Sequence, residues 1–321
     1  MGNIVSRIRP SRPIRRRDTK NASAPTGDVK AYKRGSRVSM SHVAQYILRG
    51  LCIALLVLCP ALLLPEISQD VAQGITLLAM LAAVVVMTEY SAAYPGLIEF
   101  RDAKPYNRLR FCMLAVVVLA ITLLQRDLLL TPGADTFFVS GAIGLGNILD
   151  FPFSPVRLLV LSLPQGLAPE HMAIVAAAAA LAYIMSLIGL AVFLVAMFFG
   201  YWPRSDIAFN VWVNLPNFDP TKGVDVVQRL ERDAQVNVLL GIILPFSLPV
   251  LLHISTFLVQ PMTLETPLAL VWGVSLWAFI PVNLIMRGVA MYRIAQLVRA
   301  QRRRIAEAED ALPLPARSAY S

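Results

Sequence analysis

The stretch that decides the fold is residues 172–200, which read MAIVAAAAALAYIMSLIGLAVFLVAMFFG and include no charged residue. About 20 apolar residues in a helix are enough to cross the roughly 30 Å hydrocarbon core of a bilayer. Residues 172–200 are therefore predicted to form a transmembrane helix that is tilted or protrudes at one end. Ala178, Ala182 and Ser186 recur at helical spacing with Gly189 nearby, and this small-residue seam predicts close packing with another helix, in this chain or in another one.

Further apolar stretches on either side predict five more spans, at about residues 43–64, 71–88, 109–124, 236–259 and 267–286. The composition agrees, because 57% of the 321 residues are hydrophobic, 15% are charged, and the mean hydropathy is +0.62. A soluble chain would carry about 25% charged residues. The sequence thus predicts an all-α polytopic membrane protein, with a membrane domain of six transmembrane helices over residues 43–286.

The distribution of basic residues predicts which way the chain faces. With six spans, 27 of the 29 Lys and Arg residues fall on one side, and only Arg126 and Arg157 fall on the other. Cytoplasmic segments of membrane proteins are enriched in Lys and Arg, so both termini are expected in the cytoplasm. The abundance of Ala, Leu and Arg favours a bacterial inner membrane. The net charge of +9 comes from basic residues beside the spans, where they are expected to contact anionic lipid headgroups. No nucleic-acid partner is expected.

Four segments lie outside the predicted spans. Residues 1–42 are rich in Arg, Lys, Ser and Pro and are expected to be a disordered cytoplasmic arm. The extracytoplasmic loop, residues 125–171, is apolar and interrupted by prolines, which favours a folded cap on the membrane surface over a re-entrant element. The cytoplasmic loop, residues 201–235, is expected to end in an amphipathic helix.

The fourth segment is the cytoplasmic tail, residues 287–321. It continues the last span with an apolar stripe and a basic stripe, and the basic stripe is expected to contact anionic lipids. The alternative is a helix that simply projects from the last span. The predicted lipid-contacting residues are Arg293, Arg299, Arg302, Arg303 and Arg304.

The spans offer little that resembles catalytic chemistry. His253 and Asn283 form the candidate intramembrane polar site, since His253 follows Pro245 and Pro249 and Asn283 lies beside Pro281. Two histidines other than His253 occur and fall on opposite sides of the membrane, so no metal site is expected. No catalytic residue and no cofactor is predicted, and an enzyme is the least favoured class.

These patterns favour a non-enzymatic accessory, assembly or scaffold component of a membrane protein complex. Its expected partners are the bilayer and other membrane protein subunits. The alternative is a small-solute transporter or channel around the fifth and sixth spans, where the proline-interrupted helices carry His253 and Asn283. An inverted repeat, which many transporters show, is not visible in the sequence.

Overall fold

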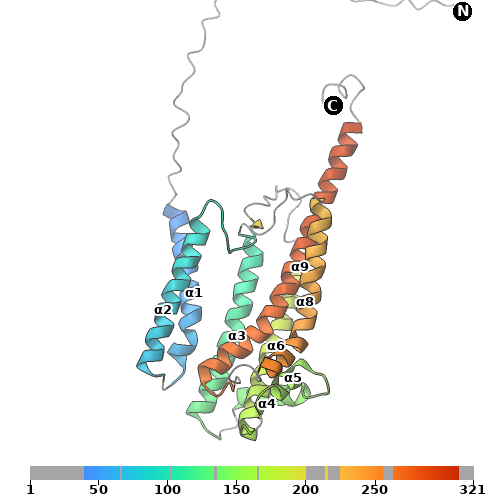
Figure 1. Cartoon of the computed structure of the whole chain (residues 1–321). Helices are drawn as coiled ribbons and strands as arrows, with labels where there is room; N and C mark the ends of the chain where they lie inside the picture. The colour runs from blue at the N-terminus through green and yellow to red at the C-terminus, as the bar shows by residue number, and fades with distance from the viewer. Residues whose placement is uncertain are drawn as a thin grey trace, which may run out of the picture. The chain divides into compact units, whose positions relative to one another are not determined.

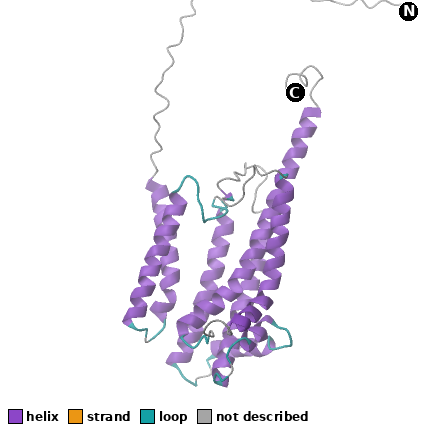
Figure 2. Cartoon of the chain, viewed as in Figure 1, coloured by secondary structure: helices purple, strands orange, loops and turns teal. Residues whose placement is uncertain are grey.

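A computed structural model describes residues 40–65, 67–101, 103–133, 136–164, 166–199, 214–215, 225–255 and 263–310. Within these residues the fold is entirely helical and no strand occurs (Figures 1 and 2). Six helices are long and apolar enough to cross a membrane: α1 (Met40–Leu63), α2 (Gln69–Ser91), α3 (Lys104–Leu130), α6 (Pro169–Phe198), α8 (Val226–Ser255) and α9 (Pro267–Asp310). The predicted fold class, an all-α protein with six transmembrane helices, is confirmed.

The helices extend beyond the predicted spans wherever charged residues flank an apolar core. The third span was predicted at 109–124, yet α3 runs over 27 residues from Lys104 to Leu130, with Pro105 in its first turn. The predicted amphipathic helix before the fifth span is continuous with that span in α8, and the tail continues α9 without a break to Asp310. Backbone hydrogen bonds do not depend on hydropathy, so a helix continues past the last apolar residue.

Two shorter helices, α4 (Phe137–Ile148) and α5 (Pro155–Leu161), form within the predicted loop 125–171. Both begin with a hydroxyl cap: Thr136 Oγ1 accepts from Val139 N at 3.2 Å, and Ser154 Oγ accepts from Val156 N at 3.2 Å. Both helices pack against α6. The loop is therefore a folded element, in line with the cap interpretation, although its depth relative to a membrane stays a prediction.

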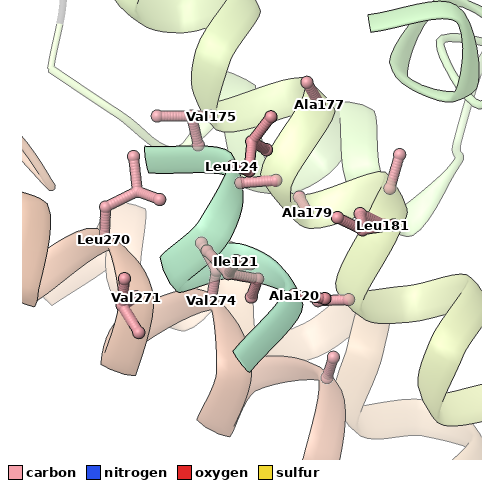
Figure 3. Close-up of a cluster of buried hydrophobic side chains, with 14 of the residues drawn as sticks. Ala120, Ile121, Leu124, Val175, Ala177, Ala179, Leu181, Leu270, Val271 and Val274 are labelled. Carbon is pink, nitrogen blue, oxygen red and sulfur yellow. The ribbon is translucent and has the colours of Figure 1, made fainter. Parts of the chain in front are cut away.

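Helices α3, α6, α8 and α9, with α4 and α5, form what we call the body. Ile121 and Leu124 of α3 meet Val175 of α6 and Val274 of α9 in a continuous buried cluster (Figure 3). α8 and α9 make the most extensive helix pair. They run antiparallel, because Gly288 of α9 packs against Ala234 of α8, whereas Pro281, earlier in α9, packs against Gly241, later in α8. The body is thus held by close contacts between sequence-distant helices.

Helices α1 and α2 form a hairpin that is packed more sparsely. They meet at Gly50, where an added Cβ would lie 2.7 Å from Met87 Cγ. Leu56 of α1 and Leu64, which directly follows α1, join the buried cluster of the body, whereas α2 contributes no described residue to either buried cluster. Only 6% of the most apolar part of α2 is buried, against 50% for α9.

The bundle has two distinct ends. α2 and α6 end, and α3 and α8 begin, at what we call the basic end, which carries Arg49, Arg101, Arg108 and Arg287. α4 and α5 lie at the opposite end, here called the α4–α5 end (Figure 1). The segment 92–103, which connects α2 to α3 at the basic end, is called the strap.

Candidate functional site

The two residues predicted to form an intramembrane polar site, His253 and Asn283, lie at different depths. His253 is exposed in the last turn of α8, and Asn283 is half-buried in the middle of α9. Gly241 of α8 packs against the carbonyl oxygen of Pro281 in α9, which brings Asn283 close to the level of Gly241. His253 follows Gly241 by twelve residues, or about 18 Å along a helix. The two side chains do not share one site.

The buried polar atoms without a hydrogen-bond partner are spread over several helices. Among the described residues inside the spans they are Gln125 Nε2, Ser186 Oγ, Ser275 Oγ, Trp277 Nε1 and Asn283 Oδ1. They come from α3, α6 and α9, and none comes from α8. An unpaired polar atom in an apolar surrounding costs about 1–3 kcal/mol, so a bound water or solute that pairs with it would be stabilised there.

The sequence does not reveal where these buried polar atoms lie. Gln125 was placed outside the third span because the apolar run ends at Leu124, yet α3 continues to Leu130 and buries Gln125. Ser186 was recognised only as a small residue suited to packing. Ser275 and Trp277 stand in an apolar sequence and gave no signal of their own.

The small-residue seam of α6 is used within the chain. Ala178, Ala182 and Ser186 are fully buried in the body. Gly189 packs against α3, since a Cβ added there would lie 2.6 Å from Met113 Cγ. The seam therefore brings α3 and α9 close to α6 and leaves no free face for another chain at these positions.

The groups needed to hold a metal ion do not converge in the described part of the chain. No set of three or more His, Cys, Asp or Glu side chains lies close enough together there. The cysteines are free thiols, with Cys52 and Cys59 half-buried in α1 and Cys112 exposed in α3.

The best-defined ion pair and hydrogen bonds of the body lie at the basic end. Arg287 of α9 pairs with Glu99 of the strap through two contacts, from Nε to Oε2 at 2.5 Å and from Nη2 to Oε1 at 2.8 Å. Both side chains are largely shielded, with 26% of Arg287 and 13% of Glu99 exposed. A bidentate guanidinium–carboxylate pair is directional as well as strong, so it fixes the strap against α9.

Two of the arginines predicted to contact lipid are engaged by protein instead. Arg299 donates to Glu231 at 2.5 Å and Arg302 donates to Asp225 at 2.6 Å, and both carboxylates belong to the first turns of α8 or the residue before it. The hydrogen bond from Arg302 lowers the pKa of the Asp225 carboxyl. The extension of α9 is thereby docked on α8 as far as Arg302.

The other three predicted lipid contacts differ from one another. Arg293 is half-buried and donates from Nη1 to Gln296 Oε1 at 3.3 Å. Arg303 and Arg304 are exposed, as are all residues from 301 to 310. Both lie on the part of α9 that extends about 24 Å or more beyond Arg287, as in the alternative of a projecting helix, and their contact with lipid stays a prediction.

The strap itself is folded. The Glu89 carboxylate Oε2 accepts hydrogen bonds from the backbone N–H groups of Gly96, Leu97 and Ile98, at 2.9, 2.8 and 3.2 Å. Three convergent donors hold the start of the strap around one carboxylate. No motif in the sequence around residues 89–98 indicates these contacts.

Phe100 anchors the other half of the strap. Its side chain is fully buried against Tyr106, with ring centroids 4.6 Å apart, although its φ of 52° is unfavourable for a residue with a side chain. Asn107 Nδ2 donates to the Phe100 carbonyl at 2.7 Å, and Phe100 N donates to the Asn214 carbonyl at 2.6 Å. The strap therefore joins α2, α3 and α9 into a rigid junction.

Taken together, the described residues form a tightly joined body, a polar junction at the basic end and a hairpin with large uncovered apolar faces. No protein-family description, no curated protein and no solved structure matches this chain.

Proposed function

We propose that this chain is a non-enzymatic integral membrane protein that serves as an accessory, assembly or scaffold component of a membrane protein complex. The α1–α2 hairpin carries this proposal. α2 exposes a broad apolar face that includes Leu77, Leu78 and Leu81, each more than half exposed. The hairpin is attached to the body mainly through α1. The apolar face of α2 therefore stays available for lipid or for another subunit.

The body supplies the second requirement of a scaffold, which is rigidity. Close helix contacts at Gly241 and Gly288 and the Glu99–Arg287 pair hold the strap, α8 and α9 in one arrangement. The exposed end of α9, residues 303–310, adds a charged helical surface outside the apolar region. The body thus joins the apolar surface of the hairpin to the charged surface at the end of α9. A rigid connection between two such surfaces suits a component that brings other subunits together.

The test inserts a photocrosslinking amino acid at Leu78 of α2 in native membranes, with Val116 of α3 as the matched control. The two side chains are similarly exposed, at 57% and 50%. We expect position 78 to give one protein adduct of fixed size and position 116 to give lipid adducts. The same subunit should copurify in a constant ratio and be lost in Leu78→Trp but not in Val116→Trp.

Two results would contradict the proposal. Lipid adducts alone at both positions would show that α2 only faces the bilayer. An adduct of twice the 35.2 kDa chain mass would show that the hairpin pairs with a second copy, which is not an accessory role.

We further propose that both termini are cytoplasmic and that the membrane is the inner membrane of a bacterium. The asymmetry of Lys and Arg supports this orientation, since the strap, the start of α8 and the end of α9 all lie at the basic end. Reporter fusions after residues 68, 150 and 263 are expected to read outside, and fusions after residues 100, 220 and 310 inside. One inverted reading would overturn the orientation.

A small-solute transporter or channel is the second candidate. The unpaired buried polar atoms on α3, α6 and α9 favour it, because a permeating solute or water needs such groups inside the bundle. Conductance and solute release from vesicles containing the purified chain would support this function. In that case the Ser186→Ala and Ser275→Ala variants should alter the flux, whereas in a scaffold both variants leave vesicles equally tight.

A further inference from the structure

A hollow of about 350 Å³ lies at the α4–α5 end, between α4, α5 and the first two turns of α6. Its size falls at the lower end of the range of ligand sites in proteins. Apolar side chains supply most of its wall, among them Val156, Val160 and Met172. Asp150 and Arg157 stand at one side of it, with Asp150 Oδ1 and Arg157 Nε 3.7 Å apart. The hollow is therefore amphipathic.

The Asp150 carboxylate and the Arg157 guanidinium are both accessible to a ligand. Their separation of 3.7 Å is longer than a good hydrogen bond, and their side chains are 61% and 43% exposed. The backbone beneath Arg157 is held firmly, because Ser154 Oγ accepts from Arg157 N at 3.3 Å and Ser154 is itself fully buried. A guanidinium beside a carboxylate presents a site for a ligand that carries both an anionic and a cationic group.

The surroundings of the hollow are apolar and face outward. The turn between α4 and α5 exposes Phe151 and Phe153, and Phe153 is 83% exposed at a φ of 65°. Leu161, which lines the hollow, is also exposed. Together these exposed side chains make an apolar surface around the hollow that suits contact with lipid chains better than contact with water.

The position of the hollow along α6 agrees with contact with lipid. The lining residues Met172, Ala173 and Ala176 come three to seven residues after the start of α6 at Pro169, or about 5–10 Å along the helix. The polar region of one leaflet has a comparable thickness of about 5–8 Å. With the membrane boundary at the start of α6, the hollow is expected at the level of the lipid headgroups and the first methylene groups of their chains.

We propose that this hollow binds one phospholipid with a zwitterionic headgroup that bears a primary amine, as in phosphatidylethanolamine. The phosphate pairs with the guanidinium of Arg157, which matches phosphate oxygens with two parallel donors. The ammonium donates to the Asp150 carboxylate, and the upper part of the lipid chains lies against the apolar wall. A quaternary choline group has no N–H to donate, and a glycerol headgroup has no positive charge, so both bind less well.

The experiment uses the full-length chain in mild detergent, stripped of lipid and incubated with micelles that contain phosphatidylethanolamine, phosphatidylcholine or phosphatidylglycerol. Native mass spectrometry counts the lipids retained. We expect one retained phosphatidylethanolamine, preferred about tenfold over the other two, since a charge-assisted hydrogen bond changes a binding constant by about that factor. Arg157→Gln and Asp150→Asn should each lower retention about tenfold.

Two further variants keep the result interpretable. Arg126→Gln removes a charge at the same end, in a residue that does not line the hollow, and should retain lipid like the natural chain. Ala173→Trp fills the hollow and keeps both charges, and it should abolish retention without lowering the unfolding temperature. Loss of binding in this variant shows that the hollow, and not the charge pair alone, holds the lipid.

The outcomes separate this proposal from its rivals and from the accessory function. Equal retention of the three lipids, or natural retention in Arg157→Gln, would overturn the site. Soluble phosphoethanolamine competing as well as the whole lipid would show that the ligand is not a lipid. None of these results depends on whether the α1–α2 hairpin binds another subunit.

Discussion

The α1–α2 hairpin and the body are almost equally hydrophobic and very differently packed. The most apolar windows of α1 and α2 have mean hydropathies of 2.3 and 2.1, and those of α3 and α9 have 2.1 and 2.0. Yet 17% and 6% of the α1 and α2 windows are buried, against 44% and 50% for α3 and α9, with α6 and α8 in between at 22% each. Hydropathy decides which helices enter a bilayer, whereas helix contact in lipid depends on shape and polar ties, since lipid chains are as apolar as leucine.

The residues that distinguish the two regions are small or charged. The body has a run of buried alanines in α6, including Ala178 and Ala182, and glycines at the α8–α9 contact. It also has ion pairs that join distant segments, such as Glu99–Arg287. The hairpin has its close contact at Gly50, and most of its leucines face away from the chain.

The largest expected effect separates the two regions with one type of substitution. A Cβ at Gly241 would lie 2.5 Å from the carbonyl oxygen of Pro281, whereas a Cβ at Gly74 in α2 meets nothing within 4 Å. Gly241→Ala should therefore lower the free energy of unfolding by about 2–3 kcal/mol, because backbone cannot move aside. Gly74→Ala should leave it unchanged or raise it by about 0.5 kcal/mol.

Unfolding of both variants in detergent, followed by circular dichroism, measures this difference. Gly288→Ala, which meets the Ala234 carbonyl oxygen at 2.6 Å, serves as a second body variant and should resemble Gly241→Ala. Equal losses at Gly74 and Gly241 would mean that the hairpin is packed as closely as the body.

A smaller effect is expected where the strap joins the two regions. Glu99→Gln leaves the guanidinium of Arg287 without its carboxylate, and should cost about 2 kcal/mol of unfolding free energy given the partial exposure of both groups. The double variant with Arg287→Gln should lose less than the sum of the single losses, since the two residues act as a pair. Glu265→Gln, an exposed carboxyl at the other end of α9, is the matched control and should change little. Additive losses would refute the coupling.

The smallest effect is expected in the extension of α9, the part of the helix that continues beyond the apolar span. The hydrogen bond from Arg302 lowers the pKa of Asp225 below that of an unfolded aspartate, so the pair stabilises docking above the ordinary aspartate pKa. This stabilisation is lost as the pH falls through the lowered pKa, that is, below about pH 4. A spin label at Gln301 should thus become more mobile at pH 3 than at pH 6.

Salt offers an independent check on the same contact. Both partners are exposed, so 1 M salt, with a screening length of about 3 Å, should raise the mobility of the label at pH 6. Arg302→Gln should have the same effect, whereas Arg304→Gln should not. A label indifferent to pH, salt and Arg302→Gln would mean that α9 is held there by apolar contacts alone.

The sequence predicted the number and approximate place of the long helices because each contains an unbroken apolar run. It did not predict their ends, since Arg108 and Gln125 are polar and still lie inside α3. Residues 201–213 and 216–224 of the predicted cytoplasmic loop, and the arm before residue 40, lie outside the described residues. Expectations about them stay predictions.

The candidate sites were harder to predict because they depend on contacts between distant segments. Nothing in the residues around Glu99 reveals that Arg287, 188 positions later, is its partner. His253 and Asn283 were grouped because both accompany prolines, yet the antiparallel pairing of α8 and α9 sets them at different levels. Asp150 and Arg157, seven residues apart, approach each other because the turn between α4 and α5 lets both helices pack against α6.

Helix α9 also has a mechanical consequence. Its 44 residues form one rod about 66 Å long, and Pro281 is its only internal proline, so bending concentrates there. Glu99 pairs with Arg287, about 9 Å along the helix from Pro281, and Asp310 lies about 35 Å beyond Arg287. Between the Glu99–Arg287 pair and Asp310 the rod is tied to α8 by Arg299–Glu231 and Arg302–Asp225, the second of these about 12 Å from Asp310. A force applied at residues 303–310 therefore loads these two ion pairs first, and reaches the strap only after they open.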